Sequence, residues 1–375
     1  MIPFNKPYAS GKEYEYLKDA VLSGKISGNG KYTKLCHDYF QKKYHFKKAL
    51  LTSSCTDALE MCAILQDIKE GDEVIMPSYT FVSTSNAYIL RGAKIIFADS
   101  EVNHPNIDAS KIEALITPKT KAICVVHYAG NACEMDTIMA LAAKYNLSVS
   151  EDAAQAVDSF YKGKPLGSIG DVAAFSFHET KNIISGEGGM LTVNNDKLID
   201  RSEIIWEKGT NRSAFFRGEI DKYGWVDMGS SFLPSELQAA YLYAQLEEMD
   251  NIQNRRKSIW NQYYEGLKAL ETQGKLQLPQ IPTYATNNAH MFYLVTNTLE
   301  ERSALISHLK KHDILAVFHY LSLHDSPFYR DKHDGRDLPN SDRFSNTLLR
   351  LPLFFELTDQ EVNKIIQSIH QFYNS

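Results

Sequence analysis

The sequence predicts an α/β protein with a large domain built on a mostly parallel central sheet flanked by helices, and a smaller C-terminal α/β domain. Between residues 71 and 152, short apolar stretches such as EVIMP, KIIFAD and KAICVV alternate with amphipathic stretches of helical length. This alternation is typical of βαβ units, which build parallel sheets covered by helices. At 375 residues the chain is long for one core. We expect a large domain at 1–245 and a small domain at 246–375.

The expected elements follow the chain in order. After the helix Tyr32–Tyr44 comes a short strand, and a helix begins near Thr56. Strands at 73–77, 94–99, 121–130 and 147–152 are separated by the helices Ser78–Arg91, Ala109–Leu115 and Met135–Tyr145. Two strands, Val172–Phe177 and Met190–Val193, precede helices at Lys197–Lys208 and from Pro234 towards Leu267. The C-terminal part is predicted to contain strands at 290–295 and 314–320 and helices at Glu300–Lys311, Ser341–Leu349 and Thr358–Phe372.

Composition excludes several classes of protein. The net charge of -6 provides no basic surface for nucleic acid or an anionic membrane. The five cysteines include no CxxC pair, so neither a disulfide framework nor a metal site is indicated. No run approaches the roughly 18 apolar residues of a membrane span, and the N-terminus lacks the apolar core of a signal peptide. A reducing cytoplasm is therefore the expected location.

One lysine lies in a chemically suggestive stretch, DVAAFSFHETKNIISGEGGMLTVNN (171–195). Lys181 falls in a polar turn between two apolar strands, five residues after Ser176 and just before a run of small residues. A buried ammonium tends to lose its proton, and a neutral amine can form a Schiff base with a carbonyl. Enzymes that use pyridoxal phosphate need such a lysine, a hydroxyl near the phosphate, and glycines beside the cofactor. A surface hairpin with a solvated lysine is the alternative for this stretch alone.

Two further sites occur at expected strand ends. Ser53, Ser54 and Thr56 are found at a helix start, where free amides attract an anion, although most such residues only cap the helix. Asp152 follows an apolar strand and could lie under a flat ligand or, alternatively, cap a helix. Gln155, expected one helical turn later, could reach the hydroxyl side of a pyridoxal ring. No GxGxxG follows any strand, so a dinucleotide site has little support.

Taken together, seven motifs resemble the DegT type of sugar-nucleotide aminotransferase, a branch of the fold-type I pyridoxal phosphate enzymes. The resemblance runs essentially end to end and keeps the family's order and spacing. The motifs are TSSCTDAL (52–59), MPSYTFVST (76–84), EDAAQA (151–156), FSFHETKN (175–182), GEGGML (186–191), LPSELQAAYLYAQL (233–246) and VFHYLSLH (317–324).

The resemblance implies a role for each matching residue. Lys181 would form the Schiff base with pyridoxal phosphate and move the proton during catalysis. The residues expected to hold the cofactor are Asp152 at the ring nitrogen, Gln155 near the ring hydroxyl, Phe81 stacked on the ring, and Cys55, Thr56 and Ser176 at the phosphate. His319 and Tyr320 match positions near the sugar, although His319 could equally be a packed histidine at a strand end. Ser231 stands where the family usually has an asparagine that reaches the phosphate of the neighbouring subunit, so this contact is in doubt.

The resemblance also implies a reaction. The HETKN motif, the segment 209–225 and the variant GSSFLPSELQAA are most similar to the dTDP-4-amino-4,6-dideoxygalactose transaminases. These enzymes move the amino group of glutamate to C4 of dTDP-4-keto-6-deoxyglucose, for bacterial surface glycans such as enterobacterial common antigen. A homodimer with shared active sites is implied as well. The alternatives are a gluco product or amination at C3, a related sugar dehydratase, which carries histidine in place of the Schiff-base lysine, and a non-catalytic sugar-nucleotide binding module.

Overall fold

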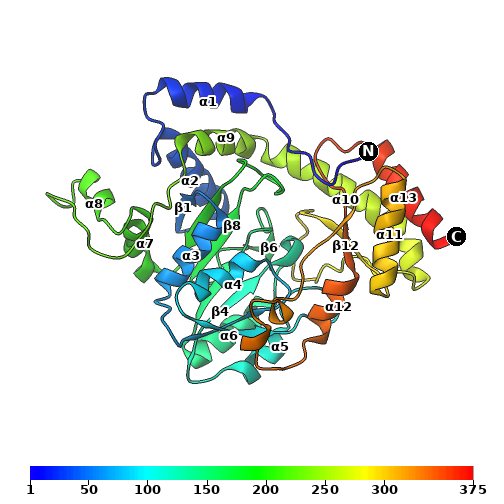
Figure 1. Ribbon diagram of the computed structural model, residues 1–375. Helices are drawn as coiled ribbons and strands as arrows, with labels where there is room; N and C mark the ends of the chain where they lie inside the picture. The colour runs from blue at the N-terminus through cyan, green and yellow to red at the C-terminus, as the bar shows by residue number, and fades with distance from the viewer. Residues whose placement is uncertain (375) are drawn as a thin grey trace.

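The computed structural model describes residues 1–374, and a seven-stranded sheet forms its centre (Figure 1). β9 runs antiparallel to both of its neighbours, and the other pairs in the sheet are parallel. The predicted mostly parallel sheet is therefore confirmed. In spatial order the strands are β1 (Lys48–Thr52), β9 (Gly189–Val193), β8 (Val172–Ser176), β5 (Ser148–Asp152), β4 (Thr120–Val126), β2 (Glu73–Pro77) and β3 (Lys94–Ala98).

Helices cover both faces of this sheet because its strands are apolar on both sides. In β1, Ala49 and Leu51 pack into one core, whereas Leu50 packs into the other, as the two-residue repeat of a strand requires. The first core is covered by α2 (Lys31–Tyr44), α5 (Ala109–Ile112), α6 (Met135–Tyr145) and α9 (Glu236–Glu247). The second is covered by α3 (Cys55–Leu65), α4 (Val82–Ile89) and α7 (Ile199–Trp206). A small hairpin of β6 (Phe160–Tyr161) and β7 (Lys164–Pro165) lies between β5 and β8 in the sequence.

The C-terminal part has its own antiparallel sheet and its own core. β12 (Leu348–Leu351) lies between β10 (Phe292–Val295) and β11 (Val317–Phe318). The apolar core beside this sheet is formed with α10 (Met249–Thr272), α11 (Leu299–Lys311) and α13 (Asp359–Asn374), while α12 (Pro339–Thr347) precedes β12. The chain also begins here, because Ile2 forms a β-bridge with Ile314 (Figure 1). The domain division expected at residue 245 falls in the last turn of α9 and stays a prediction.

Four elements differ from the sequence prediction, each for a local reason. α1 (Lys12–Leu22) was not expected, because Glu13 and Ala20 are its only buried residues and its exposed side is partly apolar. The helix predicted from Ser78 begins at Val82, after the extended residue Phe81. The long helix predicted after Pro234 is broken at Glu248 into α9 and α10. The helix predicted at Ser341–Leu349 ends at Thr347, and Leu348–Leu351 is instead the central strand of the small sheet, because pairing on both sides overrides the helical pattern at its start.

The segment 209–231 projects away from the rest of the molecule. It contains the short helix α8 (Arg212–Phe216), which lies at the left edge of Figure 1. Large apolar side chains of this segment face solvent: Phe216, Tyr223, Trp225, Val226 and Met228, with Trp225 84% exposed. Ser231 is exposed too and forms an isolated β-bridge with Glu207. Within residues 1–374, no helix combines the length and the apolar character needed to cross a membrane.

Candidate active site

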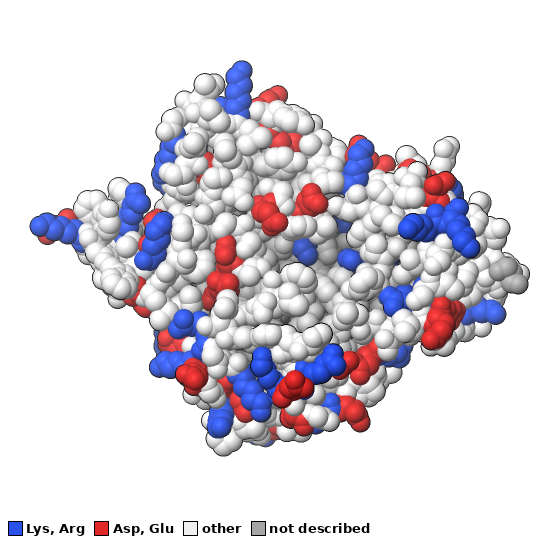
Figure 2. All heavy atoms as spheres, viewed as in Figure 1, with Lys and Arg blue, Asp and Glu red and all other residues white. Residues whose placement is uncertain are grey.

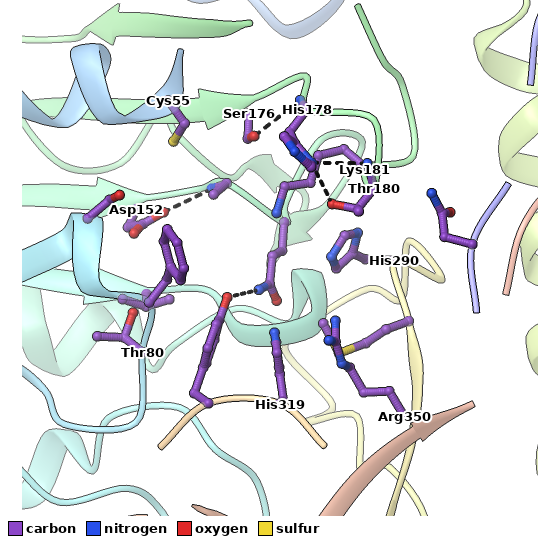
Figure 3. Close-up of a pocket in the computed structure, with 18 of the residues that line it drawn as sticks. Cys55, Thr80, Asp152, Ser176, His178, Thr180, Lys181, His290, His319 and Arg350 are labelled. Carbon is purple, nitrogen blue, oxygen red and sulfur yellow. Dashed lines mark hydrogen bonds between the residues drawn. The ribbon is translucent and has the colours of Figure 1, made fainter. Parts of the chain in front are cut away.

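A cavity of about 590 Å³ opens where the carboxyl ends of the central strands face the small sheet. In parallel α/β sheets, ligands bind at this edge. Figure 2 shows a hollow in the middle of this face, with basic side-chain atoms at its floor. All of the predicted site residues except Ser231 line the cavity: Cys55, Thr56, Phe81, Asp152, Gln155, Ser176, Lys181, His319 and Tyr320 (Figure 3).

The first corner of the cavity is the N-terminus of α3. Ser54 caps this helix, and its Oγ accepts a hydrogen bond from the Asp57 amide at 3.1 Å. The first amides of a helix have no partner inside the helix and, together with the helix dipole, attract anions. Thr56 adds a hydroxyl, and Ser176 adds another from the end of β8. This combination suits a phosphate.

A glycine allows these two elements to meet. In β9, Gly189 lies beside both Thr52 and Ser176 in the sheet register. A Cβ at this position would lie only 2.4 Å from the Ser54 carbonyl carbon. Any other residue would push the start of α3 away from Ser176, and the anion corner would open.

A buried carboxylate lies beside the corner, at the end of β5. Asp152 Oδ2 accepts a hydrogen bond from the Thr84 hydroxyl at 2.7 Å, and its Oδ1 accepts one from the Ala154 amide at 3.1 Å. Burial raises the pKa of Asp152, although the bond from Thr84 and the charge of Lys181 oppose this rise. A cation in the cavity would stabilise the ionised form. Phe81, 54% exposed and also lining the cavity, offers an aromatic face to a flat ligand.

Gln155 links this wall of the cavity to the opposite wall, and it does so from a turn rather than from the expected helix. Residues 153–157 form turns, so the expected spacing of one helical turn after Asp152, and a capping role for Asp152, are both wrong. Gln155 Oε1 accepts a hydrogen bond from the Ala129 amide at 2.6 Å, and Nε2 donates one to the Tyr320 hydroxyl at 2.9 Å. These contacts hold the side chain across the cavity.

Lys181 enters the cavity from the turn that joins β8 and β9. Its amide donates a hydrogen bond to the His178 carbonyl at 2.8 Å, which fixes the turn. Burial lowers the pKa of the Lys181 ammonium, although Cys55 and Asp152 oppose this fall. Within residues 1–374, the Lys181 Nζ forms no hydrogen bond and no ion pair. The structure thus places an unpartnered amine in the cavity.

We expect Lys181 to be the lysine that reacts at the lowest pH in the cofactor-free protein. Its lowered pKa means that more of the neutral, nucleophilic amine is present at a given pH. Lys162 is a suitable internal reference, because its hydrogen bond to Asp136 raises its pKa. Competitive acylation over a range of pH, read out by peptide mass spectrometry, should show Lys181 reacting at lower pH than Lys162. The reverse order would contradict the expected state of the amine.

The opposite wall is aromatic and comes from the C-terminal part. His319 Nδ1 lies 2.7 Å from the Tyr128 hydroxyl, and its ring stacks on Tyr320 with centroids 3.6 Å apart. Burial lowers the pKa of His319 well below its usual value, so the ring is neutral at physiological pH. His319 is therefore both a packed residue and a part of the cavity wall.

Two residues of this wall escaped the sequence prediction. Arg350, on β12, reaches the cavity with its guanidinium stacked 4.7 Å from the Phe4 ring centroid. Its Nη2 donates only a long hydrogen bond of 3.5 Å to the Phe318 carbonyl, and its buried Nε has no partner within residues 1–374. His290, just before β10, is the second. In the sequence, Arg350 stands out as a single arginine inside the apolar run LLRLPLFF, whereas no pattern distinguishes His290.

Comparison with known proteins decides the family. A model of the DegT/DnrJ/EryC1/StrS aminotransferase family matches residues 7–370. The chain belongs to this family. One curated relative is GDP-perosamine synthase of Escherichia coli O157:H7. It is 34% identical to this chain over 377 residues, which cover 100% of this chain and 99% of the relative. The spore coat polysaccharide biosynthesis protein SpsC of Bacillus subtilis (strain 168) is 33% identical over 386 residues, which cover 98% of this chain and 96% of SpsC.

Solved structures of DegT-type aminotransferases share the whole fold. The aminotransferase from Psychrobacter cryohalolentis superposes with a TM-score of 0.92 at 27% identity and covers 99% of both chains. A Streptococcus pneumoniae protein described as a sugar aminotransferase superposes in its PLP form with a TM-score of 0.90 at 26% identity, covering 100% of this chain and 98% of that one. The fold-type I assignment is therefore confirmed, and the protein is a sugar aminotransferase of the DegT type.

The cofactor of this DegT-type enzyme is pyridoxal phosphate, and the cavity fits it. Relatives are known in PLP and PMP forms. The α3 corner offers amides and hydroxyls to a phosphate, and Asp152 needs a cation such as a protonated ring nitrogen. Lys181 offers a free amine. Among residues 1–374, no group of three or more His, Cys, Asp or Glu side chains could hold a metal ion.

Proposed function

We propose that this enzyme moves the amino group of L-glutamate to C4 of dTDP-4-keto-6-deoxyglucose, giving 2-oxoglutarate and dTDP-4-amino-4,6-dideoxygalactose. The observation that carries the amino transfer is the unpartnered Lys181 amine, which shares one cavity with Asp152 and the α3 corner. The choice of sugar nucleotide and of carbon rests on the motifs HETKN and GSSFLPSELQAA.

The geometry of the first wall supports the proposed cofactor-holding roles. The amides and hydroxyls of Cys55, Thr56 and Ser176 would bind the phosphate, and Phe81 would cover one face of the ring. Asp152 would pair with the ring nitrogen and keep it protonated. Gln155, held by Ala129 and Tyr320, would serve the ring hydroxyl. Bound pyridoxal phosphate supplies a carbonyl that joins amines covalently and a ring that withdraws electrons from the adjacent carbon.

Lys181 carries the proton in both halves of the reaction. The neutral amine of Lys181 would take the proton from the glutamate Cα, because its lowered pKa leaves part of it unprotonated. In the second half the same residue delivers a proton to C4 of the sugar. The face of the sugar turned towards Lys181 therefore decides between a galacto and a gluco product. His319 and Tyr320 line the wall on which the sugar would lie.

We assign the docking of a glutamate carboxylate to Arg350. Glutamate must place its α-carboxylate one bond from the carbon that Lys181 deprotonates, so the carboxylate binds close to this lysine. Arg350 is the one guanidinium among the described residues that line the cavity, and it has donors to spare. Hydrogen bonds between guanidinium and carboxylate are strong, especially in the two-point arrangement.

Other functions receive less support. A sugar dehydratase of this family carries histidine at the Schiff-base position, which is Lys181 here. A non-catalytic binding module would not need the amine, the carboxylate and the phosphate corner together. The relative named GDP-perosamine synthase favours one specific alternative, a GDP-linked sugar as acceptor.

The reaction is tested with purified holoenzyme, glutamate and keto-sugars linked to dTDP or GDP. We expect the dTDP substrate to give an amine at C4, identified by mass spectrometry and proton NMR. A small H3–H4 coupling means an axial amine and a galacto product, whereas a large coupling means gluco. Preference for the GDP sugar, or an amine at C3, would reject the proposed substrate and leave the transaminase standing.

We expect a homodimer in which the segment 209–231 covers the partner's site. Its exposed apolar side chains, Trp225 above all, are costly to leave in water. If Ser231 reaches the partner's phosphate, Ser231→Ala should weaken cofactor retention by about 1.5–3 kcal/mol, the value of one hydrogen bond to a charged group. Light scattering measures the assembly, and dialysis followed by absorbance measures retention. A fully active monomer would refute the dimer, and unchanged retention would refute the contact.

The biological setting is proposed as bacterial surface-glycan assembly in the cytoplasm. The relative SpsC is named for spore coat polysaccharide biosynthesis, which supports a role in glycans.

A further inference from the structure

His290 occupies a central place in the cavity, and the proposed reaction gives this residue no role. It lies just before β10, is 8% exposed, and lines the cavity. Figure 3 shows its ring between Lys181 and Arg350, on the wall formed by the C-terminal part.

The hydrogen bonds of Asn182 fix which nitrogen of His290 carries a proton. Asn182 Nδ2 donates to the Asn288 carbonyl and to Gln253 Oε1, each at 2.8 Å. A backbone carbonyl only accepts, so this end of the amide must be the NH₂ group. Asn182 Oδ1 therefore faces His290 Nδ1 at 2.9 Å, and Nδ1 must donate.

The imidazole is also neutral. Burial lowers the pKa of His290 well below its usual value, and the neighbouring cations Lys181, Arg256 and Arg350 act in the same direction. With the proton on Nδ1 and the ring uncharged, Nε2 carries a lone pair and can only accept. Arg256 also fixes the backbone here, because it donates to the carbonyls of Ala289 at 3.1 Å and His290 at 2.6 Å.

Two complementary groups are thus left without partners in one cavity. Within residues 1–374, no hydrogen bond ends on His290 Nε2, an acceptor, or on Lys181 Nζ, a donor. The two side chains are tied together through Asn182, which follows Lys181 in the chain. We propose that His290 is a positioning residue for Lys181, and that its Nε2 accepts a hydrogen bond from the Lys181 ammonium once this side chain has turned towards it with the proton that it carries.

This contact would serve the moment at which Lys181 holds the proton. A buried ammonium without acceptors is unfavourable, so it needs a fixed partner close to the carbon that it serves. Asp152 lies on the other wall, towards the ring nitrogen, and is not free for this task. A neutral acceptor stabilises the ammonium without trapping its proton. The inference rests on the proposed role of Lys181.

The first test measures Lys181 itself, in cofactor-free protein and without turnover. A hydrogen bond to His290 favours the ammonium, so its loss in His290→Phe should shift the pH profile of Lys181 acylation downwards by about one unit or more. Asp152 and Arg350, the charged groups that act on Lys181, are unchanged in this variant. His290→Gln, which keeps an acceptor oxygen, should restore much of the wild-type profile.

The second test separates positioning from substrate binding. In the holoenzyme, we expect His290→Phe to lower kcat roughly ten- to hundredfold, with the KM for the keto-sugar nearly unchanged and with partial rescue by His290→Gln. His104→Phe, which replaces a half-buried histidine away from the cavity, controls for the loss of an imidazole. If His290→Phe does not fold, Asn182→Ala replaces it in the test. This variant removes the group that holds the His290 proton on Nδ1, so the pH profile of Lys181 acylation should shift downwards.

An unchanged Lys181 profile in these variants would overturn the inference, and so would a change in KM alone, which would mean that His290 contacts the sugar. The proposed substrate can fail independently of this result, because acylation of Lys181 involves no sugar nucleotide.

Discussion

Replacing Lys181 by alanine is expected to lower kcat by roughly four orders of magnitude or more, because one residue supplies both the nucleophile and the proton carrier. The cofactor should still bind, since Asp152, Phe81 and the α3 corner remain. Single-turnover measurements with glutamate would follow the loss. In the wild-type protein, borohydride treatment should add pyridoxyl mass to the peptide that contains Lys181.

Lys162→Ala is the matched control for this experiment. Lys162 lies in the exposed turn between β6 and β7 and pairs with Asp136. Its removal should leave both turnover and labelling unchanged. Label on any lysine other than Lys181, or substantial turnover in Lys181→Ala, would remove the assignment of the reactive lysine.

Arg350→Gln should reduce kcat/KM for glutamate roughly a hundredfold or more, equivalent to about 3 kcal/mol. The guanidinium has a buried Nε without a partner within residues 1–374 and stands ready to bind an anion. A glutamine keeps part of the bulk but loses the charge and the fork of donors. The two half-reactions can be followed separately by absorbance, and the glutamate half should carry the loss.

Arg350→Lys tests whether charge or geometry matters. Lysine keeps the charge but not the planar fork, so we expect it to recover only part of the activity with glutamate. Should the variants weaken the keto-sugar half-reaction and spare the glutamate half, Arg350 would bind the sugar nucleotide instead. The carboxylate of the amino donor would then need another partner.

The first wall of the site was predictable from sequence because its residues lie at the ends of strongly patterned elements. β5 and β8 are buried strands that end at Asp152 and Ser176, and parallel strands bring these ends to one edge. The predicted helix Met135–Tyr145 has the observed bounds of α6. Ser54 caps α3, as the N-cap residue types at 53–56 suggest. In all these cases the local pattern and the tertiary structure agree.

Two residues of the second wall, Arg350 and His290, were not predicted, because tertiary pairing places them. Leu348–Leu351 follows a helix and becomes a strand only between β10 and β11, and this strand aims Arg350 at the cavity. His290 reaches Lys181 through Asn182, from a position more than a hundred residues away in the chain. Gln155 reaches the cavity from a turn rather than from the predicted helix. Such contacts leave no periodic signal.

The division of the cavity between two sheets has a consequence for evolution. The side that faces the cofactor is built from residues 52–189 and is constrained by close approaches such as that of Gly189 to Ser54. The facing side is supplied by 290–351 and by Phe4 near the N-terminus. Mutations there that spare His290 and Arg350 can alter the shape and charge offered to a sugar while leaving the proton-transfer apparatus unchanged. A lineage with this architecture can therefore acquire new acceptors by drift on one surface, without passing through inactive ancestors.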